Sequence, residues 1–305
     1  MGRSARVGAA VVAGAMLLTA CEAAVGGNSR DGGRLEVVAS FYPLAEAARQ
    51  VGGERVAVAN LTPTGAEPHD LELSPRQTRQ VLEADLAVVM GRGFQPAVEE
   101  AARRRRAPTL RVLGELSLPP AGSTGGEHGG GRDPHVWLDP VLMGEVVDEV
   151  AAALSRADPA HQDGYLARAD AYAARLERLD AAYDRALTGC RRRVLVTSHE
   201  AFGWLAERYG LRERAIAGLS PEAEPDPRRL ARLARLVSRT GTTTVYTETL
   251  VSPEVAQSLA REAGVDTAVL NPLEGLTDEQ LARGDDYLTV MRDNLRLLER
   301  SLGCG

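Results

Sequence analysis

Three of the five histidines in this 305-residue chain lie in short peptides that also carry carboxylates. These peptides, with a fourth that lacks histidine, are Glu67-Pro68-His69-Asp70, Asp133-Pro134-His135-Val136-Trp137-Leu138-Asp139-Pro140, Ser198-His199-Glu200-Ala201-Phe202-Gly203 and Gly284-Asp285-Asp286-Tyr287. Neutral imidazole and carboxylate are the donors that a borderline divalent ion such as zinc selects. The peptides are far apart in sequence, so only a folded chain could bring them together. The pattern predicts a metal-capture protein, not an enzyme.

The surroundings of two of these histidines favour a ligand role. Carboxylates that accept the second ring N–H fix the tautomer and orientation of a ligating imidazole. Glu67 or Asp70 could do this for His69, and Asp133 is the neighbour of His135. Trp137 and Leu138 could exclude water from the His135 segment. Of the remaining histidines, His128 lies in a Gly-rich stretch and His161 lies on a helix flank with no acidic partner pattern.

Motifs of hydrolases and nucleotide-binding enzymes are missing from the sequence. His199-Glu200 begins like the zincin helix motif, but that motif needs a second histidine four residues after the first, and position 203 is glycine. Gly91-Arg92-Gly93 does not extend to a dinucleotide fingerprint, since position 96 is proline. No nucleophile elbow or phosphate-binding loop is present.

Composition narrows the class of protein further. The length suffices for two α/β domains. The net charge of −6 argues against a nucleic-acid partner, which requires a basic face. All 36 basic residues are arginine, which we interpret as genomic base composition. The run Arg103 to Arg106 is interpreted as a solvated cluster at a helix C-terminus.

The N-terminus predicts export. Arg3 and Arg6 precede an apolar stretch, Val7 to Leu18, that is too short for a comfortable membrane span. It ends in Leu18-Thr19-Ala20-Cys21, which resembles the bacterial lipobox, so Cys21 is predicted to become a lipidated first residue. An ordinary signal peptide with an incidental cysteine is the alternative. The polar, Gly-rich stretch after Cys21 suits a flexible tether.

Two further cysteines, Cys190 and Cys304, remain. In an oxidising compartment two such cysteines often pair. Cys190 precedes a predicted strand and Cys304 follows the last predicted helix, so a bridge would fix the C-terminus. Two free buried thiols are the alternative.

Strand-like and helix-like segments alternate along the chain, which predicts βαβ units and parallel sheets. The strands are expected at 35–40, 56–61, 86–90, 109–113, 193–197, 215–218, 243–247 and 267–270. A long helix is expected from Pro159 to Leu187, because its apolar residues form one helical stripe. The predicted fold is α/β, with two lobes, each a mainly parallel sheet flanked by helices, joined by one long rigid helix. Ligands of such sheets bind beyond the carboxyl ends of the strands, where His69 and His199 fall.

The predicted organisation has five segments. Residues 1–20 are the signal peptide, 21–34 the lipidated flexible tether, 35–158 the N-terminal α/β lobe, 159–188 the linking helix and 189–305 the C-terminal α/β lobe. Within the first lobe, the Gly-rich stretch Pro119–Arg132 is expected to be a mobile loop.

Nearly the whole mature chain resembles the cluster A-I solute-binding lipoproteins of bacterial zinc and manganese ABC importers. The resemblance is carried by these peptides: Ser40-Phe41-Tyr42-Pro43-Leu44, Glu67-Pro68-His69-Asp70, His135-Val136-Trp137-Leu138-Asp139-Pro140, His199-Glu200-Ala201-Phe202-Gly203-Trp204, Gly218-Leu219-Ser220-Pro221-Glu222-Ala223-Glu224-Pro225, Asn271-Pro272-Leu273 and Gly284-Asp285-Asp286-Tyr287. The resemblance implies a metal between the lobes, bound by His69, His135, His199 and Asp285. Asp286 is adjacent to Asp285 and stays open as the fourth ligand.

The resemblance also implies the function. The chain is expected to be an extracytoplasmic receptor, a lipid-anchored monomer on the outer face of the cell membrane, that captures Zn²⁺ and delivers it to an ABC permease. Three imidazoles and one carboxylate favour zinc over manganese, and protons are expected to weaken binding below about pH 6. The rivals are a manganese or iron receptor of the same family, a surface adhesin, and a zinc hydrolase, which would need an open coordination position.

Overall fold

The computed structural model describes residue 2 and residues 33–118, 133–222 and 226–305. Contacts divide the chain into residues 1–33 and residues 34–305, and all helices and strands of the described residues belong to the second unit. The predicted signal peptide, Cys21, most of the tether and the Pro119–Arg132 loop with His128 lie outside the described residues. None of the helices in the described ranges is long and apolar enough to cross a membrane.

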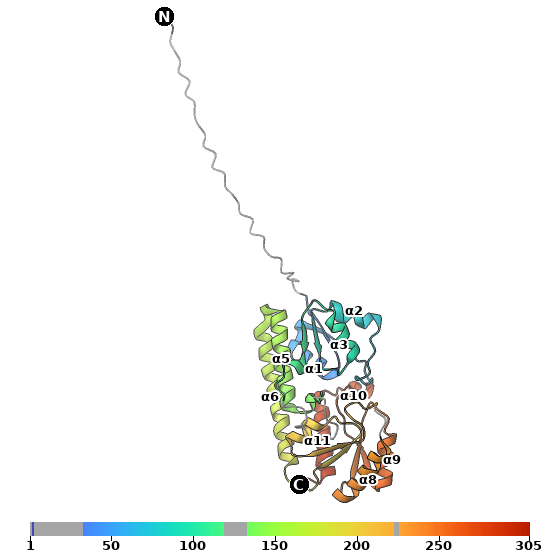
Figure 1. Cartoon of the computed structure of the whole chain (residues 1–305). Coiled ribbons are helices and arrows are strands. Elements are labelled where there is room, and N and C mark those ends of the chain that lie inside the picture. The colour runs from blue at the N-terminus through green and yellow to red at the C-terminus, as the bar shows by residue number, and fades with distance from the viewer. Residues whose placement is uncertain (1, 3–32, 119–132, 223–225) are drawn as a thin grey trace. The chain divides into compact units, whose positions relative to one another are not determined.

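Residues 34–305 contain two four-stranded parallel sheets, as the alternation of strands and helices predicted (Figure 1). The first sheet has the order β2-β1-β3-β4 and the second the order β6-β5-β7-β8. Their strands are β1 (Leu35–Ala39), β2 (Val56–Asn60), β3 (Leu86–Val89), β4 (Thr109–Arg111), β5 (Val194–Thr197), β6 (Arg212–Ala215), β7 (Thr244–Thr247) and β8 (Asp266–Val269). In both sheets the first strand of the lobe is central, so the chain winds outward from it in both directions.

Helices cover both faces of each sheet. They are α1 (Tyr42–Gly52), α2 (Pro75–Glu83), α3 (Pro96–Arg103), α4 (Val112–Glu115), α5 (Pro140–Ala157), α6 (Gln162–Leu187), α7 (Gly203–Arg208), α8 (Pro227–Thr240), α9 (Glu254–Ala263), α10 (Asp278–Arg283) and α11 (Tyr287–Leu302). Short 3₁₀ turns lie at Gly53–Arg55, Val136–Leu138 and Pro159–His161. Because both sheet faces are buried, strands such as β3 and β5 are apolar almost throughout.

One apolar core is shared by the two lobes. It contains the inward faces of both sheets, for example Val88 and Leu195, together with buried residues of α1, α5, α6 and α11. Two smaller cores lie on the outer faces, under α2 and α3 in the first lobe and under α8 and α9 in the second. The lobes therefore pack as parts of one interior.

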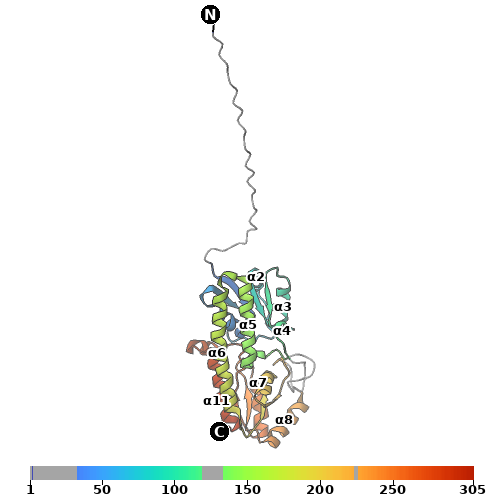
Figure 2. The same ribbon diagram turned by 90° about the vertical axis from the view of Figure 1, so that its left-hand side faces the viewer.

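The helix α6 spans both lobes (Figures 1 and 2). Its 26 residues at 1.5 Å each make a rod of about 39 Å. The predicted stripe is confirmed, since its members are all buried in the shared core: Tyr165, Tyr172, Leu176, Leu179, Tyr183 and Leu187. At one end Arg168 donates to the carbonyls of Val51 and Gly52, and at the other the Tyr183 hydroxyl donates to the carbonyl of Met291.

Two local predictions were wrong. The strand expected at 215–218 runs instead over Arg212–Ala215. β6 is an edge strand, and its charged residues lack the apolar pattern from which strands were predicted. The helix α10 was not expected. Its N-cap is Thr277, which forms a capping box with Gln280, and its C-cap is Gly284 in the left-handed conformation. Both are sequence features of helix ends.

A disulfide joins Cys190 and Cys304, across 114 residues. Cys190 follows the end of α6 and Cys304 follows the end of α11, so the bridge ties the C-terminal helix to the start of the second sheet. This is the pairing that the sequence predicted.

Replacing both cysteines by serine is expected to lower the free energy of unfolding by about 2–5 kcal/mol, because the cross-link restricts the unfolded chain over a long loop. Urea unfolding followed by circular dichroism measures this difference. Metal affinity serves as the control and should not change, since the bridge does not contact the site described below. Equal stability with and without the bridge would contradict the expectation.

Candidate metal centre

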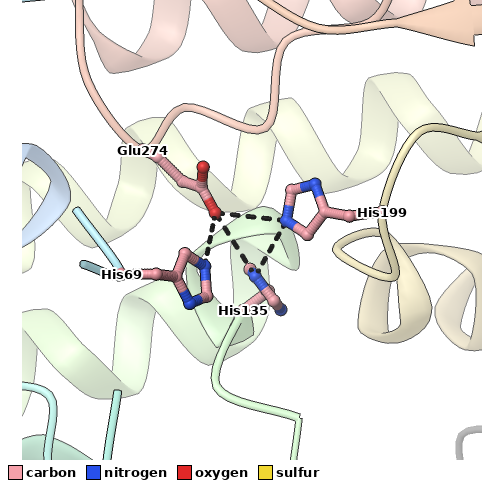
Figure 3. A group of neighbouring side chains, drawn as sticks. All are labelled: His69, His135, His199 and Glu274. Carbon is pink, nitrogen blue, oxygen red and sulfur yellow. Dashed lines mark hydrogen bonds and ion pairs between the residues drawn. The ribbon is translucent and has the colours of Figure 1, made fainter. Parts of the chain in front are cut away.

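Four buried side chains converge between the two lobes: His69, His135, His199 and Glu274 (Figure 3). The Glu274 Oε1 atom lies 3.1 Å from His69 Nε2, 3.4 Å from His135 Nε2 and 3.3 Å from His199 Nε2. The Nε2 atoms of His135 and His199 are 3.3 Å apart. His135, His199 and Glu274 are at most 1% exposed, and the His69 side chain is 9% exposed.

Three of the four groups follow the carboxyl ends of parallel strands. His69 lies in the loop after β2, His199 two residues after β5, and Glu274 in the loop after β8. His135 instead precedes the 3₁₀ turn that leads into α5. The cluster therefore receives side chains from both lobes (Figure 3).

His135 is held by its neighbour Asp133. One carboxylate oxygen accepts the backbone N–H of His135 at 2.9 Å and lies 2.6 Å from its ring Nδ1. Trp204 of the C-terminal lobe donates its indole N–H to the Asp133 carbonyl at 3.0 Å. The fully buried Trp137 ring packs against the imidazole, with centroids 5.1 Å apart. The ring is therefore fixed with Nε2 facing the cluster, as the sequence around it suggested.

His199 is held by Glu248, which follows β7. The Glu248 carboxylate accepts the backbone N–H of His199 at 3.0 Å and lies 2.7 Å from its Nδ1. Glu248 is itself 6% exposed. Both fully buried imidazoles thus have a carboxylate behind them and present Nε2 to the common centre.

Glu274 is presented by a turn that the protein holds rigidly. Leu273 adopts a positive φ of 56°, which is costly for a residue with a branched side chain. Its N–H donates to the side chain of Asn271, at 2.7 Å. Asn271 exchanges hydrogen bonds with Asn294 of α11, and Trp137 donates its indole N–H to the Pro272 carbonyl. These contacts stabilise a backbone conformation that directs the carboxylate inward.

His69 is the least constrained of the three rings. Glu67 accepts the backbone N–H groups of His69 and Asp70, at 2.9 and 3.3 Å, and so shapes the loop. Within the described residues no carboxylate is hydrogen-bonded to the His69 Nδ1 atom, contrary to the expectation for Glu67 or Asp70. The ring packs edge-on against Phe94, with centroids 4.5 Å apart.

The cluster is a strongly coupled electrostatic unit. Burial opposes the charge of Glu274, but His199, His135 and His69 hold the pKa of its carboxyl well below the usual range. Burial likewise opposes the charge of the two inner imidazoles, yet Asp133 and Glu274 raise the pKa of His135 to about 9. Glu248 and Glu274 raise the pKa of His199 well above its ordinary value. Burial lowers the pKa of His69. The carboxylates and the inner imidazoles therefore stabilise each other's charged forms.

The separations between these atoms fit a small tetrahedral ion. Ligands about 2.0–2.1 Å from a central zinc lie about 3.3–3.4 Å from each other along the edges of a tetrahedron. Four of the six separations among the donor atoms run from 3.1 to 3.4 Å, and all six are within 4.8 Å. Three imidazole nitrogens and one carboxylate oxygen form a donor set that suits zinc. The cluster can therefore enclose one ion with little movement.

The structure does not bring Asp285 to this cluster, so Glu274 replaces it as the fourth group. The Asp285 carboxylate pairs with Arg283 at 2.7 Å, just beyond the C-terminus of α10. Asp286, the open alternative, is the N-cap of α11 and accepts the backbone N–H of Thr289. It also pairs with Arg175 of α6 at 3.5 Å. Both aspartates have local roles at helix ends.

Two functional carboxylates were therefore missed by sequence reasoning. Glu274 and Glu248 each follow a predicted strand, β8 and β7, within a few residues. The rule that drew attention to His69 and His199 applies equally to acidic residues after strands. Its application there would have identified both. His161 lies away from the cluster, with its Nδ1 2.7 Å from Asp158.

Comparison with known proteins agrees with this geometry. A model of the ZnuA family, described as zinc-uptake complex component A, periplasmic, matches residues 37–301. The chain belongs to the ZnuA family. This confirms the family resemblance that the sequence peptides indicated.

Three relatives illustrate the range of the likeness. The zinc-binding lipoprotein AdcA of Streptococcus pneumoniae is 35% identical over 298 residues, which cover 94% of this chain and 59% of the relative. This chain thus spans less than two thirds of the length of AdcA. The Zn(II)-bound ZnuA-like domain of that protein superposes with a TM-score of 0.75 at 36% identity, covering 88% of this chain and 99% of the domain.

The second relative matches along its whole length. The high-affinity zinc uptake system protein ZnuA of Bacillus subtilis is 33% identical over 300 residues, or 94% of each chain. The third is the laminin-binding protein Lmb of Streptococcus agalactiae, described as bifunctional with adhesin and metal-transporting activity. It superposes with a TM-score of 0.79 at 31% identity, covering 88% of this chain and 99% of Lmb.

Glu274→Gln and Asp285→Asn form a matched pair of variants, because each removes one carboxylate charge. Glu274→Gln is expected to weaken zinc binding by more than about 100-fold, since it removes the anionic donor of the cluster. Asp285→Asn should bind zinc as the unmodified chain does. Competition titration against a chromophoric chelator measures both. Loss of affinity in Asp285→Asn with retention in Glu274→Gln would reverse the assignment.

Proposed function

We propose that this protein is an extracytoplasmic zinc receptor that captures Zn²⁺ with His69, His135, His199 and Glu274. The observation that carries the proposal is the convergence of four buried donor atoms, from both lobes, at the edge lengths of a zinc tetrahedron. Membership of the ZnuA family and the zinc-bound structure of the AdcA domain support it.

The captured ion would then pass to an ABC permease in the membrane. Cys21, as a lipidated N-terminal residue, would hold the receptor at the outer face of that membrane. The lipobox-like peptide before Cys21 and the relative named as a lipoprotein support this part of the proposal. A monomer suffices for it, because one chain supplies all four ligands.

We propose a receptor and not an enzyme because four protein ligands fill a tetrahedral shell. Catalytic zinc keeps a position open for water or substrate. Here the fourth position is occupied by a buried carboxylate whose donor atom faces all three imidazoles. An ion held in this way is sequestered and not presented to a substrate.

Metal selectivity gives the direct test. The metal-free chain is expected to bind one zinc ion, and zinc should displace manganese, because three imidazoles suit zinc and divalent affinity rises from manganese to zinc. Isothermal titration with each metal, followed by competition, measures the preference. A His199→Glu variant should shift the preference toward manganese. If bound manganese is not displaced by an equimolar amount of zinc, the proposal is contradicted.

The dependence of zinc affinity on pH gives a second test. The structure indicates that affinity changes over a higher pH range than the sequence suggested. Neighbouring carboxylates raise the pKa of His135 to about 9 and that of His199 well above its ordinary value, but zinc requires neutral nitrogens. Binding must release protons, and apparent affinity should rise steadily from about pH 6 toward pH 9. Titrations at pH 7 in buffers of different ionisation enthalpy should show net release of protons.

The control for this test is Glu248→Gln. The amide keeps the shape of the side chain but removes a charge that raises the pKa of His199. This variant should release fewer protons at pH 7 and bind zinc about 10–100-fold more weakly, as loss of a carboxylate behind a ligating histidine does. Zinc binding without proton release at pH 7 would show that the inner histidines are neutral beforehand.

Adhesion is a second candidate function, favoured by the likeness to Lmb. The Glu274→Gln variant, which is expected to lose zinc affinity, separates the two roles. If this variant still adheres to laminin, the protein has an adhesive surface that is independent of the cluster. If the unmodified chain does not adhere to laminin, metal capture is the remaining function.

A further inference from the structure

The helix α8, Pro227–Thr240, has an unusual charge pattern. Its sequence contains five arginines and no acidic residue, although the chain as a whole carries a net charge of −6. Arg229 is buried and donates to the Ala215 carbonyl, so it serves the fold. The other four are exposed, and we name them the α8 stripe: Arg228, Arg232, Arg235 and Arg239.

The α8 stripe is narrow and straight. At 3.6 residues per turn, its four positions fall within an arc of about 60° around the helix axis. Along the axis they cover about 16 Å. The opposite side of the helix is apolar, with Leu233 and Val237 buried in the outer core of the second lobe. Packing thus fixes the orientation of the helix and turns all four guanidinium groups to one side.

The stripe is not neutralised from within the protein. Among the residues that the structure describes, no carboxylate pairs with any of its four side chains. Some exposed arginines of other helices do have such partners: Arg103 and Arg104 pair with Glu100, and Arg296 pairs with Asp293. The stripe is therefore a local positive field on an acidic protein.

The neighbouring strand adds to this field. β6 is the edge strand, and the register pairs Arg212 with Val194 and Arg214 with Val196. Paired residues of parallel strands share a face of the sheet. Val194 and Val196 lie in the core beneath α8, so the exposed Arg212 is on the α8 side of the sheet. Figures 1 and 2 place α8 at the end of the C-terminal lobe that is farther from the N-terminal lobe.

We infer that the α8 stripe binds the phosphate headgroups of an anionic lipid bilayer. Guanidinium groups match phosphate oxygens with paired hydrogen bonds, and a flat row of four suits a surface more than a single small anion. The net negative charge would otherwise repel such a membrane, so the stripe would decide which side of the receptor approaches it. The inference rests on the export proposed above but not on zinc binding.

The test uses residues 34–305, which contain every helix and strand, both sheets and the disulfide. The four stripe arginines are changed together to Gln, a residue of similar helix propensity. A matched control changes four exposed arginines elsewhere to Gln, which alters the net charge by the same amount: Arg76, Arg79, Arg178 and Arg185. Circular dichroism and zinc titration show that each variant is folded and keeps its metal site.

Binding is measured by co-sedimentation with vesicles of phosphatidylcholine, with or without phosphatidylglycerol. The unmodified chain and the control should bind the anionic vesicles only, and high salt should abolish that binding. The stripe variant should bind at least about tenfold more weakly. Equal binding by the stripe variant, equal loss in the control, or binding to neutral vesicles would overturn the inference.

Absence of vesicle binding by the unmodified chain would overturn it as well. If the stripe variant nevertheless lowered zinc uptake in cells, the partner would be an acidic protein surface, such as that of a permease, and not lipid. Unchanged zinc affinity in the stripe variant keeps this result separate from the zinc-receptor proposal.

Discussion

The structure depends on one buried carboxylate surrounded by three imidazoles. An ionised carboxylate without partners in a dry interior is strongly unfavourable. Glu274 is 1% exposed and has its Oε1 atom within 3.4 Å of all three Nε2 atoms, so its charge is compensated only while both lobes supply their histidines. A divalent ion can replace the protons of those rings without leaving a charge unbalanced. The same arrangement of charged groups that stabilises Glu274 also provides the ligands for a metal ion.

The lobes are joined in a way that protects this arrangement. The His135 segment belongs to the first lobe by sequence, but side chains of the second lobe bind it at several points. Trp204 donates to the Asp133 carbonyl, the Tyr287 hydroxyl donates to the Trp137 carbonyl at 2.6 Å, and Arg208 pairs with Asp139, the N-cap of α5. With the shared core and α6, these contacts resist hinge bending. Metal exchange must therefore use local movement, for which the loop of His69 has the fewest restraints.

Much of this could be predicted from the sequence because the signals are local. Apolar runs between turn residues gave seven of the eight strands near their observed positions, and the buried stripe gave α6. The failures are also local in cause. The strand β6 has a charged edge, and α10 is short, so neither has the apolar pattern of a buried element. Asp285, which the resemblance implied as a ligand, lies just beyond the end of α10 and pairs with Arg283.

The sequence alone pointed to the three imidazoles, since His69, His135 and His199 each lie in a short peptide that also carries a carboxylate. Only the tertiary structure decided the fourth group. Which carboxylate reaches the centre depends on the turn at Leu273, held by Asn271, Asn294 and Trp137 from distant parts of the chain. Choosing between Glu274 and Asp285 requires the positions of two lobes in space, and no spacing along the chain contains that information.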